Sequence, residues 1–297
     1  MVRITDITLS CIDHLPHDKA DLLRFLDFLI ATEVDAIELS ERMRELLSPL
    51  PDFHSYILPG NKARLRGLGD ALCGDYLQTF IWAKKSFNGG DAASGGDGID
   101  DIEFCPSNGY RCATALAAEW VISGAGNNVA SSFGGIGGNA STEELIMILR
   151  MNGLRKADKT YEFFPEMARL FCKITGENMR SDKPVIGEKI FNVESGVHVD
   201  GILKQPECYE PYPPEAVGQK REIVLGKQSG TASIRAKLSE LNMQCAEGCI
   251  PRILERVKAA ASIKNGAVSM LEFAEIVKSK SFKSLGDGKP EAVGRRP

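Results

Sequence analysis

His198 is the side chain with the clearest capacity for chemistry, because an imidazole gains and loses protons near neutral pH. It lies in a largely apolar stretch, Val197–Leu203, and a single histidine in such a setting is more often structural than catalytic. Glu194 and Tyr209 are near enough in the sequence to orient it, although a surface or turn role is the simpler interpretation of both. The weight of this candidate set therefore depends on the motif around it.

A glycine-rich run, Gly134–Gly138, precedes a pattern typical of a helix start, Ser141-x-x-Glu144. This pattern predicts a capping box that opens a helix through Arg150. Helix N-termini attract anions, so the run invites a phosphate-binding interpretation. It matches neither G-x-G-x-x-G nor a P-loop, and a nucleotide fingerprint is therefore a weak prediction.

The eight cysteines are irregularly spaced, and the two close pairs, Cys105 with Cys112 and Cys245 with Cys249, lack the C-x-x-C spacing of zinc or redox centres. Buried structural thiols are the default expectation. A thiolate nucleophile at Cys11 or Cys105 is the alternative, but His14 is its only evident positive helper.

Composition narrows the class of partner. The chain has 297 residues, 43% hydrophobic and 26% charged, with a formal net charge of −4. Its charges are mixed, without a basic stripe, which argues against nucleic acid and anionic membrane surfaces as partners. We find no signal-peptide pattern and no apolar run long enough for a membrane helix, and we expect a cytoplasmic protein that acts on small molecules.

Strand and helix patterns alternate in the first half of the chain. A strand is predicted over residues 3–10, a helix capped near Asp18 carries an apolar face from Leu22 to Ile30, and a strand follows over 35–40. Such a unit favours a parallel sheet. Further strands are predicted over 54–60, 79–84, 99–105 and 128–133, and a helix over 114–123. Residues 79–84 fit the end of a helix running from Leu72 equally well.

We divide the chain into a barrel-like α/β region (1–153), a linker, lid and helical subdomain (154–283), and a disordered tail (284–297). Helices are predicted in the second region over 162–175, 231–241, 250–261 and 270–278. A glycine-rich loop over 88–98 lies within the first region.

The stretch from Gly187 to Gly230 resembles the lid of the homocitrate and isopropylmalate synthases, because several irregular motifs recur in the same order. The phrases that carry the resemblance are Glu194-Ser-Gly-Val-His198-Val-Asp-Gly201, Tyr209-Glu-Pro and Leu225-Gly-Lys-Gln-Ser-Gly230. The resemblance covers residues 100 to 240 well and the first 40 weakly. It implies a TIM-barrel metalloenzyme that condenses an acyl-CoA with a 2-oxoacid, and a lid that acts across a homo- or heterodimer.

The resemblance also implies roles for single residues. His198 matches the lid histidine that handles the acetyl methyl proton or the nascent hydroxyl, with Glu194 and Tyr209 beside it. Gly137, Gly138 and Thr8 are expected to bind substrate, since the glycine run occupies the place where the acetyl-CoA thioester would lie.

The metal motifs of the family are largely replaced. Where the family has D-T-T-L-R-D-G-E-Q, this chain has Ser10 for the arginine and Cys11 for the metal-binding aspartate. In the motif E-F-H-x-H-N-D, Cys105 and Ser107 replace both histidines, and Asn139 alone persists as a ligand. One amide cannot hold a divalent metal by itself. Cys11, Asp13, His14, Cys105 and Asn139 would form a replacement zinc or iron site if they converged.

The barrel is short. Eight strand-helix units take about 250 residues, and the region up to 153 supports about six strands, with the shortfall between 40 and 99. We therefore predict an α/β, TIM-barrel-derived fold with a shortened or incomplete barrel, followed by a mostly helical lid region. No counterpart of the strand that carries the family's catalytic Glu is evident, so the barrel is either rearranged or completed by a partner chain.

Two functions follow from this pattern. The first is a homocitrate-synthase-like acyltransferase, possibly one subunit of a two-chain enzyme. The second is a catalytically inactive relative with a structural or regulatory dimerisation role. The lid phrases are closer to the nitrogen-fixation type of homocitrate synthase, which favours 2-oxoglutarate as the 2-oxoacid.

Overall fold

The computed structural model describes residues 2–61, 64–66, 103–124, 126–156 and 158–279. They form two compact units: unit 1 comprises Met1–Ile190 and Glu215–Gly218, and unit 2 comprises Phe191–Pro214 and Gln219–Pro297. Residues 154–190, which we had grouped with the helical region, pack within unit 1. The glycine-rich loop and the tail predicted above lie outside the described residues.

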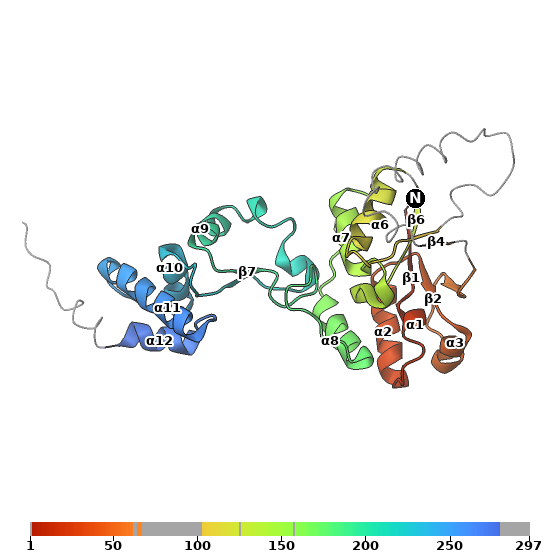
Figure 1. Cartoon of the computed structure of the whole chain (residues 1–297), viewed down its shortest axis with the longest axis horizontal. Helices are drawn as coiled ribbons and strands as arrows, with labels where there is room; N and C mark the ends of the chain where they lie inside the picture. Colours follow the sequence, from red (N-terminus) through yellow and green to blue (C-terminus); the bar gives the residue numbers. More distant parts are fainter. Residues whose placement is uncertain (1, 62–63, 67–102, 125, 157, 280–297) are drawn as a thin grey trace, which may run out of the picture. The chain divides into compact units, whose positions relative to one another are not determined.

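Unit 1 is built on a six-stranded parallel sheet in the order β3-β2-β1-β6-β5-β4. Figure 1 shows β1 between β2 and β6. The strands are β1 (Arg3–Asp6), β2 (Ala36–Glu38), β3 (Tyr56–Ile57), β4 (Arg64–Arg66), β5 (Glu103–Cys105) and β6 (Asn128–Ser131). First and last strands pair while consecutive strands are neighbours, which is the cyclic order of a barrel opened between β3 and β4. The predicted fold class, a shortened TIM-barrel-derived α/β fold, is confirmed.

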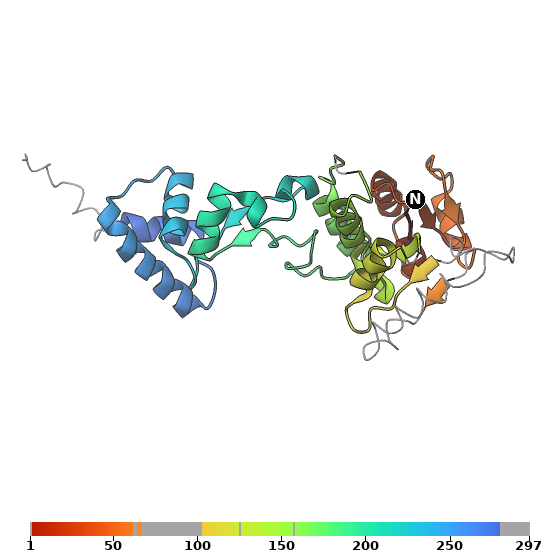
Figure 2. The same ribbon diagram turned by 90° about the horizontal axis from the view of Figure 1, so that it is seen from above.

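Helices cover this sheet. The helical segments of unit 1 are α1 (Thr8–Cys11), α2 (Lys19–Ala31), α3 (Glu41–Leu47), α6 (Ala113–Ile122), the 3-10 segment η2 (Phe133–Gly138), α7 (Thr142–Met151), α8 (Phe164–Thr175) and η4 (Pro214–Val217). The views in Figures 1 and 2 place α2, α6 and α7 on one side of the sheet. Phe25 of α2 packs against Phe133 of η2 and Phe171 of α8, with ring centroids 5.8 and 6.0 Å away. This contact ties α8 to unit 1.

Local signals at the start of the chain are partly confirmed. Asp18 caps α2 as predicted, accepting hydrogen bonds from the backbone N–H groups of Ala20 and Asp21. The strand predicted over 3–10 is wrong beyond Asp6, because Thr8–Cys11 forms a helical turn. The strand predicted over 79–84 lies outside the described residues, whereas β4 had no prediction.

Unit 2 combines a two-stranded parallel sheet with helices. Its elements are β7 (Asn192–Val193), α9 (Gly196–Lys204), η3 (Pro206–Cys208), β8 (Glu222–Ile223), α10 (Thr231–Glu240), η5 (Glu247–Cys249), α11 (Ile250–Lys264) and α12 (Met270–Lys278). The helices predicted over 231–241, 250–261 and 270–278 are confirmed, and α8 confirms the one over 162–175. Buried residues such as Ile234, Ile253 and Phe273 form the core shared by α10, α11 and α12.

Among the described residues, every helix is too short or too polar to cross a lipid bilayer.

Candidate functional site

Three of the positions expected at the metal site come together at the mouth of the half-barrel. The Cys105 thiol lies 3.5 Å from Asn139 Oδ1, and Asn139 Nδ2 lies 3.5 Å from Cys11 Sγ. Cys11 ends α1, Cys105 ends β5, and Asn139 follows η2, so the carboxyl ends of three strands supply them. We call Asp6, Cys11, Glu38, Cys105 and Asn139 the barrel mouth.

The barrel mouth does not fit a hard divalent metal. Mg²⁺ and Mn²⁺ require several oxygen ligands, and structural zinc takes four ligands. In the part of the chain that the structure describes, no group of three or more His, Cys, Asp or Glu side chains is arranged to hold a metal ion. Asp13 and His14 therefore do not complete the replacement site considered above.

Cys11 is a poor nucleophile in this setting. Burial, together with the nearby acidic groups of Asp6, Glu38 and Cys105, raises the pKa of its thiol to about 11. The thiol is therefore protonated at neutral pH, whereas thiolate chemistry needs a lowered pKa. This counts against the cysteine-nucleophile alternative.

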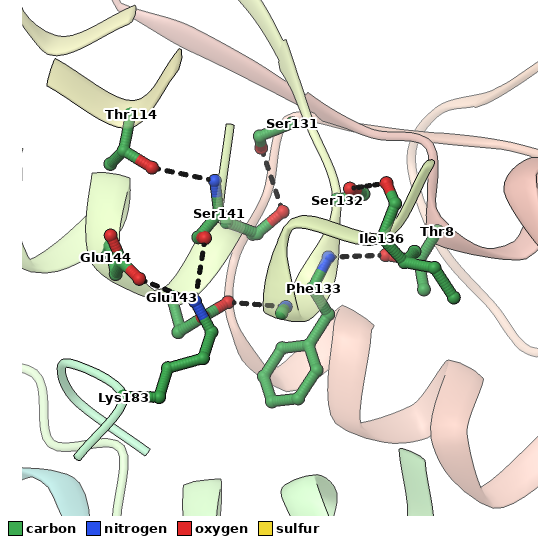
Figure 3. A network of polar contacts seen from close by, with 12 residues as sticks. Thr8, Thr114, Ser131, Ser132, Phe133, Ile136, Ser141, Glu143, Glu144 and Lys183 are labelled. Atoms are coloured by element: carbon green, nitrogen blue, oxygen red, sulfur yellow. Dashed lines mark hydrogen bonds and ion pairs between the residues drawn. The ribbon is translucent and has the colours of Figure 1, made fainter. Parts of the chain in front are cut away.

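Asp6 and Thr8 are committed to internal hydrogen bonds. Burial raises the pKa of Asp6 to about 6, although hydrogen bonds from Thr142 and Thr8 lower it. The Thr8 hydroxyl accepts the Phe133 N–H at 2.7 Å and is fully buried (Figure 3). Thr8, our candidate substrate-binding residue, therefore anchors the start of the glycine run through this hydrogen bond.

Ser10, which stands where the family has an arginine, donates a hydrogen bond to the Glu38 carbonyl. A buried cation nearby comes from β4 instead. Arg64 lies 2.6 Å from Glu38 Oε2 and 2.6 Å from Glu103 Oε2, and all three side chains are under 9% exposed. Sequence reasoning missed Arg64. Its signal was an arginine beside the apolar Leu65, at a point in the sequence between the strands that carry Glu38 and Glu103.

The glycine loop, residues Phe133–Gly138, is shaped by backbone conformation. Gly134, Gly135, Gly137 and Gly138 all have positive φ, a region that only glycine enters without cost. A Cβ atom at Gly137 would lie 3.1 Å from Cys11 Sγ, whereas one at Gly138 would meet nothing within 4 Å. Of the two candidate substrate-binding glycines, Gly137 closes over the barrel mouth and Gly138 faces open space.

Two cavities flank the glycine loop. One of about 380 Å³ is lined by Gly134–Gly138, Phe171, Glu177, Asn178, Met179, Arg180 and Lys183. Another, of about 560 Å³, is lined by Asn108, Arg111, Thr114, Ala115, Gly134, Ser141, Glu144, Ile148, Arg180, Asp182, Lys183 and Pro184. Both cavities are lined by Gly134, Arg180 and Lys183. The two cavities therefore adjoin, with the glycine loop and the segment around Lys183 as their shared walls.

The capping box predicted at Ser141 is wrong. Ser141 is the N-cap of α7 but makes no side-chain cap bond. Its hydroxyl instead accepts the Lys183 ammonium at 3.0 Å, and Glu144 Oε1 lies 2.6 Å from the same nitrogen (Figure 3). The two side chains expected to form the capping box therefore bind Lys183, which is distant in the sequence.

His198 and Tyr209 lie together in unit 2, within the lid segment Ser195–Ser233. Both are exposed, and their ring centroids are 5.7 Å apart. A Cβ atom at Gly201 would come within 2.2 Å of Tyr209 Oη, so the tyrosine ring rests on α9 where no side chain intervenes. The structure brings these two candidate catalytic residues together, His198 from α9 and Tyr209 from the residue after η3.

Glu194 has a different place. Its carboxylate accepts the Gln228 N–H at 2.7 Å, and its backbone carbonyl accepts the Ser233 hydroxyl at 3.3 Å. A Cβ atom at Gly226 would lie 2.4 Å from Glu194 Oε1. The carboxylate therefore organises the loop that leads into α10.

Comparison with known proteins identifies the relatives of this chain. Residues 185–265 match the family model described as homocitrate synthase post-HMGL domain-like. The chain is 37% identical to the homocitrate synthase omega subunit of Clostridium pasteurianum over 144 residues, which is 48% of this chain and 40% of that protein.

Two further relatives carry other names. A putative (R)-citramalate synthase of Methanosphaerula palustris is 38% identical over 151 residues, covering 50% of this chain and 30% of that protein. The 2-isopropylmalate synthase of Methanocaldococcus jannaschii is 36% identical over 159 residues, covering 51% and 30%. The matches thus span about half of this chain and less than half of each relative. The resemblance to this group of synthases is confirmed.

Proposed function

Because the chain is a divergent relative of the homocitrate and isopropylmalate synthases, we propose that it serves in the condensation of acetyl-CoA with a 2-oxoacid as one subunit of a two-chain enzyme. The observation that supports this proposal most strongly is a difference between the polar side chains of the two units. The lid presents His198 and Tyr209 together and exposed, while the barrel mouth offers two thiols and an amide.

In this proposal the chain donates its lid to a related partner. The partner's complete barrel would hold both substrates and the divalent metal, which would supply Lewis-acid chemistry at the 2-oxoacid carbonyl. His198 moves a proton at the acetyl methyl group or at the new hydroxyl, because imidazole suits transfer near neutral pH. Tyr209 holds the imidazole in place. The name of the omega subunit from Clostridium supports an enzyme built from more than one kind of chain.

The preferred 2-oxoacid is 2-oxoglutarate, the substrate that a homocitrate synthase of the nitrogen-fixation type would use. The names of the relatives include homocitrate, citramalate and isopropylmalate synthases, so pyruvate and 2-oxoisovalerate are the alternatives to compare.

The test is complementation. A full-length synthase of this family from the same cell, with its own lid histidine changed to alanine, is mixed with this chain, and CoA release is followed with each 2-oxoacid. Activity should return with the natural chain and fall by about 10²-fold or more with His198→Ala. The matched control is His54→Ala, at an exposed histidine of unit 1 whose ring nitrogen bonds the Asp35 carbonyl and whose ring packs on Phe53; this variant should keep activity. Formation of the complex without recovered activity would contradict the proposal.

A second function is favoured by the barrel mouth itself. With Ser10, Cys11 and Cys105 at the replaced positions, the chain would be a catalytically inactive relative that stabilises or regulates its partner. Metal analysis of the purified chain and calorimetry with acetyl-CoA separate the two. Stoichiometric metal together with thioester binding would exclude a passive role, whereas a complex whose activity ignores His198 would support it.

A further inference from the structure

Lys183 ties a distant segment to the start of α7. Its ammonium lies 3.0 Å from Ser141 Oγ, 3.3 Å from Glu143 Oε1 and 2.6 Å from Glu144 Oε1. The side chain is only 16% exposed, so the three acceptors replace most of its water. An ammonium removed from water in this way is held by its partners.

Glu143 passes this contact on to the glycine loop. Its side chain is fully buried, and its second oxygen, Oε2, accepts the Gly134 N–H at 2.9 Å (Figure 3). The opposite face of Gly134 is also confined, since a Cβ atom there would lie 3.3 Å from the Phe171 ring. Lys183, Glu143 and Gly134 thus form a continuous chain of contacts.

The loop depends on such anchors because its own residues supply few. Four of its six residues are glycines at positive φ, and glycine has the largest conformational freedom to lose. Other hydrogen bonds also hold it: from the Phe133 N–H to the Thr8 hydroxyl, from the Ser132 hydroxyl and Asn139 Nδ2 to the Ile136 carbonyl, from the Gly135 N–H to the Ser132 carbonyl, and from the Asn108 N–H to the Gly138 carbonyl. The Glu143 carboxylate is therefore one of a small number of restraints on its conformation.

The segment that carries Lys183 is itself held in a strained turn. The Ile186 N–H bonds the Pro184 carbonyl at 2.8 Å around Val185, whose φ is +68°. This is a γ-turn of the rare positive-φ kind, and a β-branched residue is poorly suited to it. Val185 and Ile186 are 4% and 2% exposed, and their packing keeps the strain in place.

Gly187 closes this turn. Its N–H bonds the Lys183 carbonyl at 2.8 Å, and a Cβ atom on it would come within 2.6 Å of the backbone of Lys183. Unit 2 begins at Phe191, four residues later. The turn thus lies near the end of the first stretch of unit 1, a few residues before the chain continues into unit 2.

We propose that Lys183 is a positioning residue that sets the conformation of the glycine loop through Glu143, with the strained turn Lys183–Gly187 holding the ammonium against both. The inference goes beyond the proposed lid donation, because it takes the glycine loop of this chain, which the family resemblance implies as an acyl-thioester site, as a ligand site of its own. It makes the shape of that site depend on the segment that leads to the lid.

Hydrogen exchange of the full chain, followed by mass spectrometry without ligand, tests the restraint directly. In Lys183→Met the amides of the glycine loop should exchange about tenfold faster, because the restraint on Gly134 is weakened. Lys183→Arg keeps the charge and should stay within about threefold of the natural chain. Lys173→Met, which removes an exposed ion pair with Asp21 on α2, is the matched control and should leave the loop unchanged.

Unchanged loop exchange in a folded Lys183→Met variant overturns the proposal. If that variant does not fold, Val185→Gly provides the second test, since it removes the buried side chain whose packing holds the turn while keeping Lys183. Faster loop exchange in Val185→Gly supports the role of the turn, and unchanged exchange contradicts it.

Acetyl-CoA titration of the same variants separates the restraint on the loop from the ligand assigned to it. Binding to the natural chain that weakens about tenfold in Lys183→Met, but not in Lys183→Arg, supports both. If the natural chain binds no acetyl-CoA while loop exchange still depends on Lys183, the restraint stands and the assigned ligand falls.

Discussion

The barrel mouth of unit 1 and the lid segment of unit 2 treat their polar side chains in opposite ways. In the barrel mouth, Asp6, Glu38 and Cys105 are under 5% exposed and bind other parts of unit 1. In the lid, His198 and Tyr209 are exposed and contact each other. One region satisfies its polar groups internally, and the other leaves them for another surface.

This difference teaches where function and stability are separable. A buried charge whose partner is removed cannot be rescued by water, so substitutions in the barrel mouth should act on folding. An exposed imidazole adds little to folding, so substitutions in the lid should act on chemistry. Three experiments test that division, beginning with the largest effect.

Arg64→Met should be strongly destabilising, because it leaves Glu38 and Glu103 buried without their shared cation. We expect a loss of about 3–5 kcal/mol. Arg221→Met in unit 2 removes a pair with Glu210 in which the arginine is 29% exposed, and should cost about 1 kcal/mol. Urea unfolding of the full chain measures both.

The control is Lys204→Met, whose ion pair with Asp200 is 72% and 54% exposed. It should shift the unfolding free energy by no more than about 0.5 kcal/mol. Equal losses from Arg64→Met and Arg221→Met would break the distinction between the two units.

Gly201→Ala should affect the lid alone. The new methyl group would overlap the Tyr209 ring and push it from His198, at a cost of about 1–3 kcal/mol to unit 2. The NMR signals of the His198 ring should shift, and His198-dependent activity of the mixed enzyme should fall. Gly248→Ala, where a Cβ atom meets nothing within 4 Å, is the matched control; similar shifts in both variants would refute the assigned packing.

The smallest effect is a difference in pH dependence. Burial raises the pKa of Glu143 from 4.5 to about 7 and that of Asp6 from 3.8 to about 6. Between the unfolded and folded pKa values the native state binds more protons, so these groups stabilise unit 1 below about pH 4 and lose that contribution as the pH rises to about 7. Glu143→Gln should flatten this fall.

Unit 2 should show the opposite sign. Hydrogen bonds from Ser269 and the ammonium of Lys264 lower the pKa of Glu272 to about 2. Its contribution is present above pH 4.5 and is lost as the pH falls through 2. Unfolding free energies measured at intervals from pH 3 to 8, with probes in each unit, would contradict this contrast if both units changed in the same direction.

Much of the fold could be predicted because it depends on local pattern. Asp18 before an amphipathic run fixed the start of α2, and the alternation of strands and helices indicated a parallel sheet. The prediction failed where a distant residue changes a local preference. Ser141 and Glu144 have the spacing of a capping box, but Lys183 binds both of them from 39 residues beyond Glu144.

The site could be predicted in part for the same reason. The family motifs assigned Cys11, Cys105 and Asn139 to the metal positions but left open whether they meet, and the structure brings the three together. Arg64 belongs to none of these motifs, and its partners lie on β2 and β5. Glu194 matches the lid pattern, but only the fold shows that its carboxylate is bound by the Gln228 amide. The catalytic roles of His198 and Tyr209 stay predictions.

The pairing of β1 with β6 has a consequence for how unit 1 folds. Arg3 is paired with Asn128 and Asp6 with Ser131, so the middle of the sheet joins residues that are far apart in the sequence. Contacts of such long range delay folding, because the intervening chain must be ordered before they form. A nascent chain that has not yet emerged through Ser131 lacks the central ladder and must keep β1 unaggregated until then.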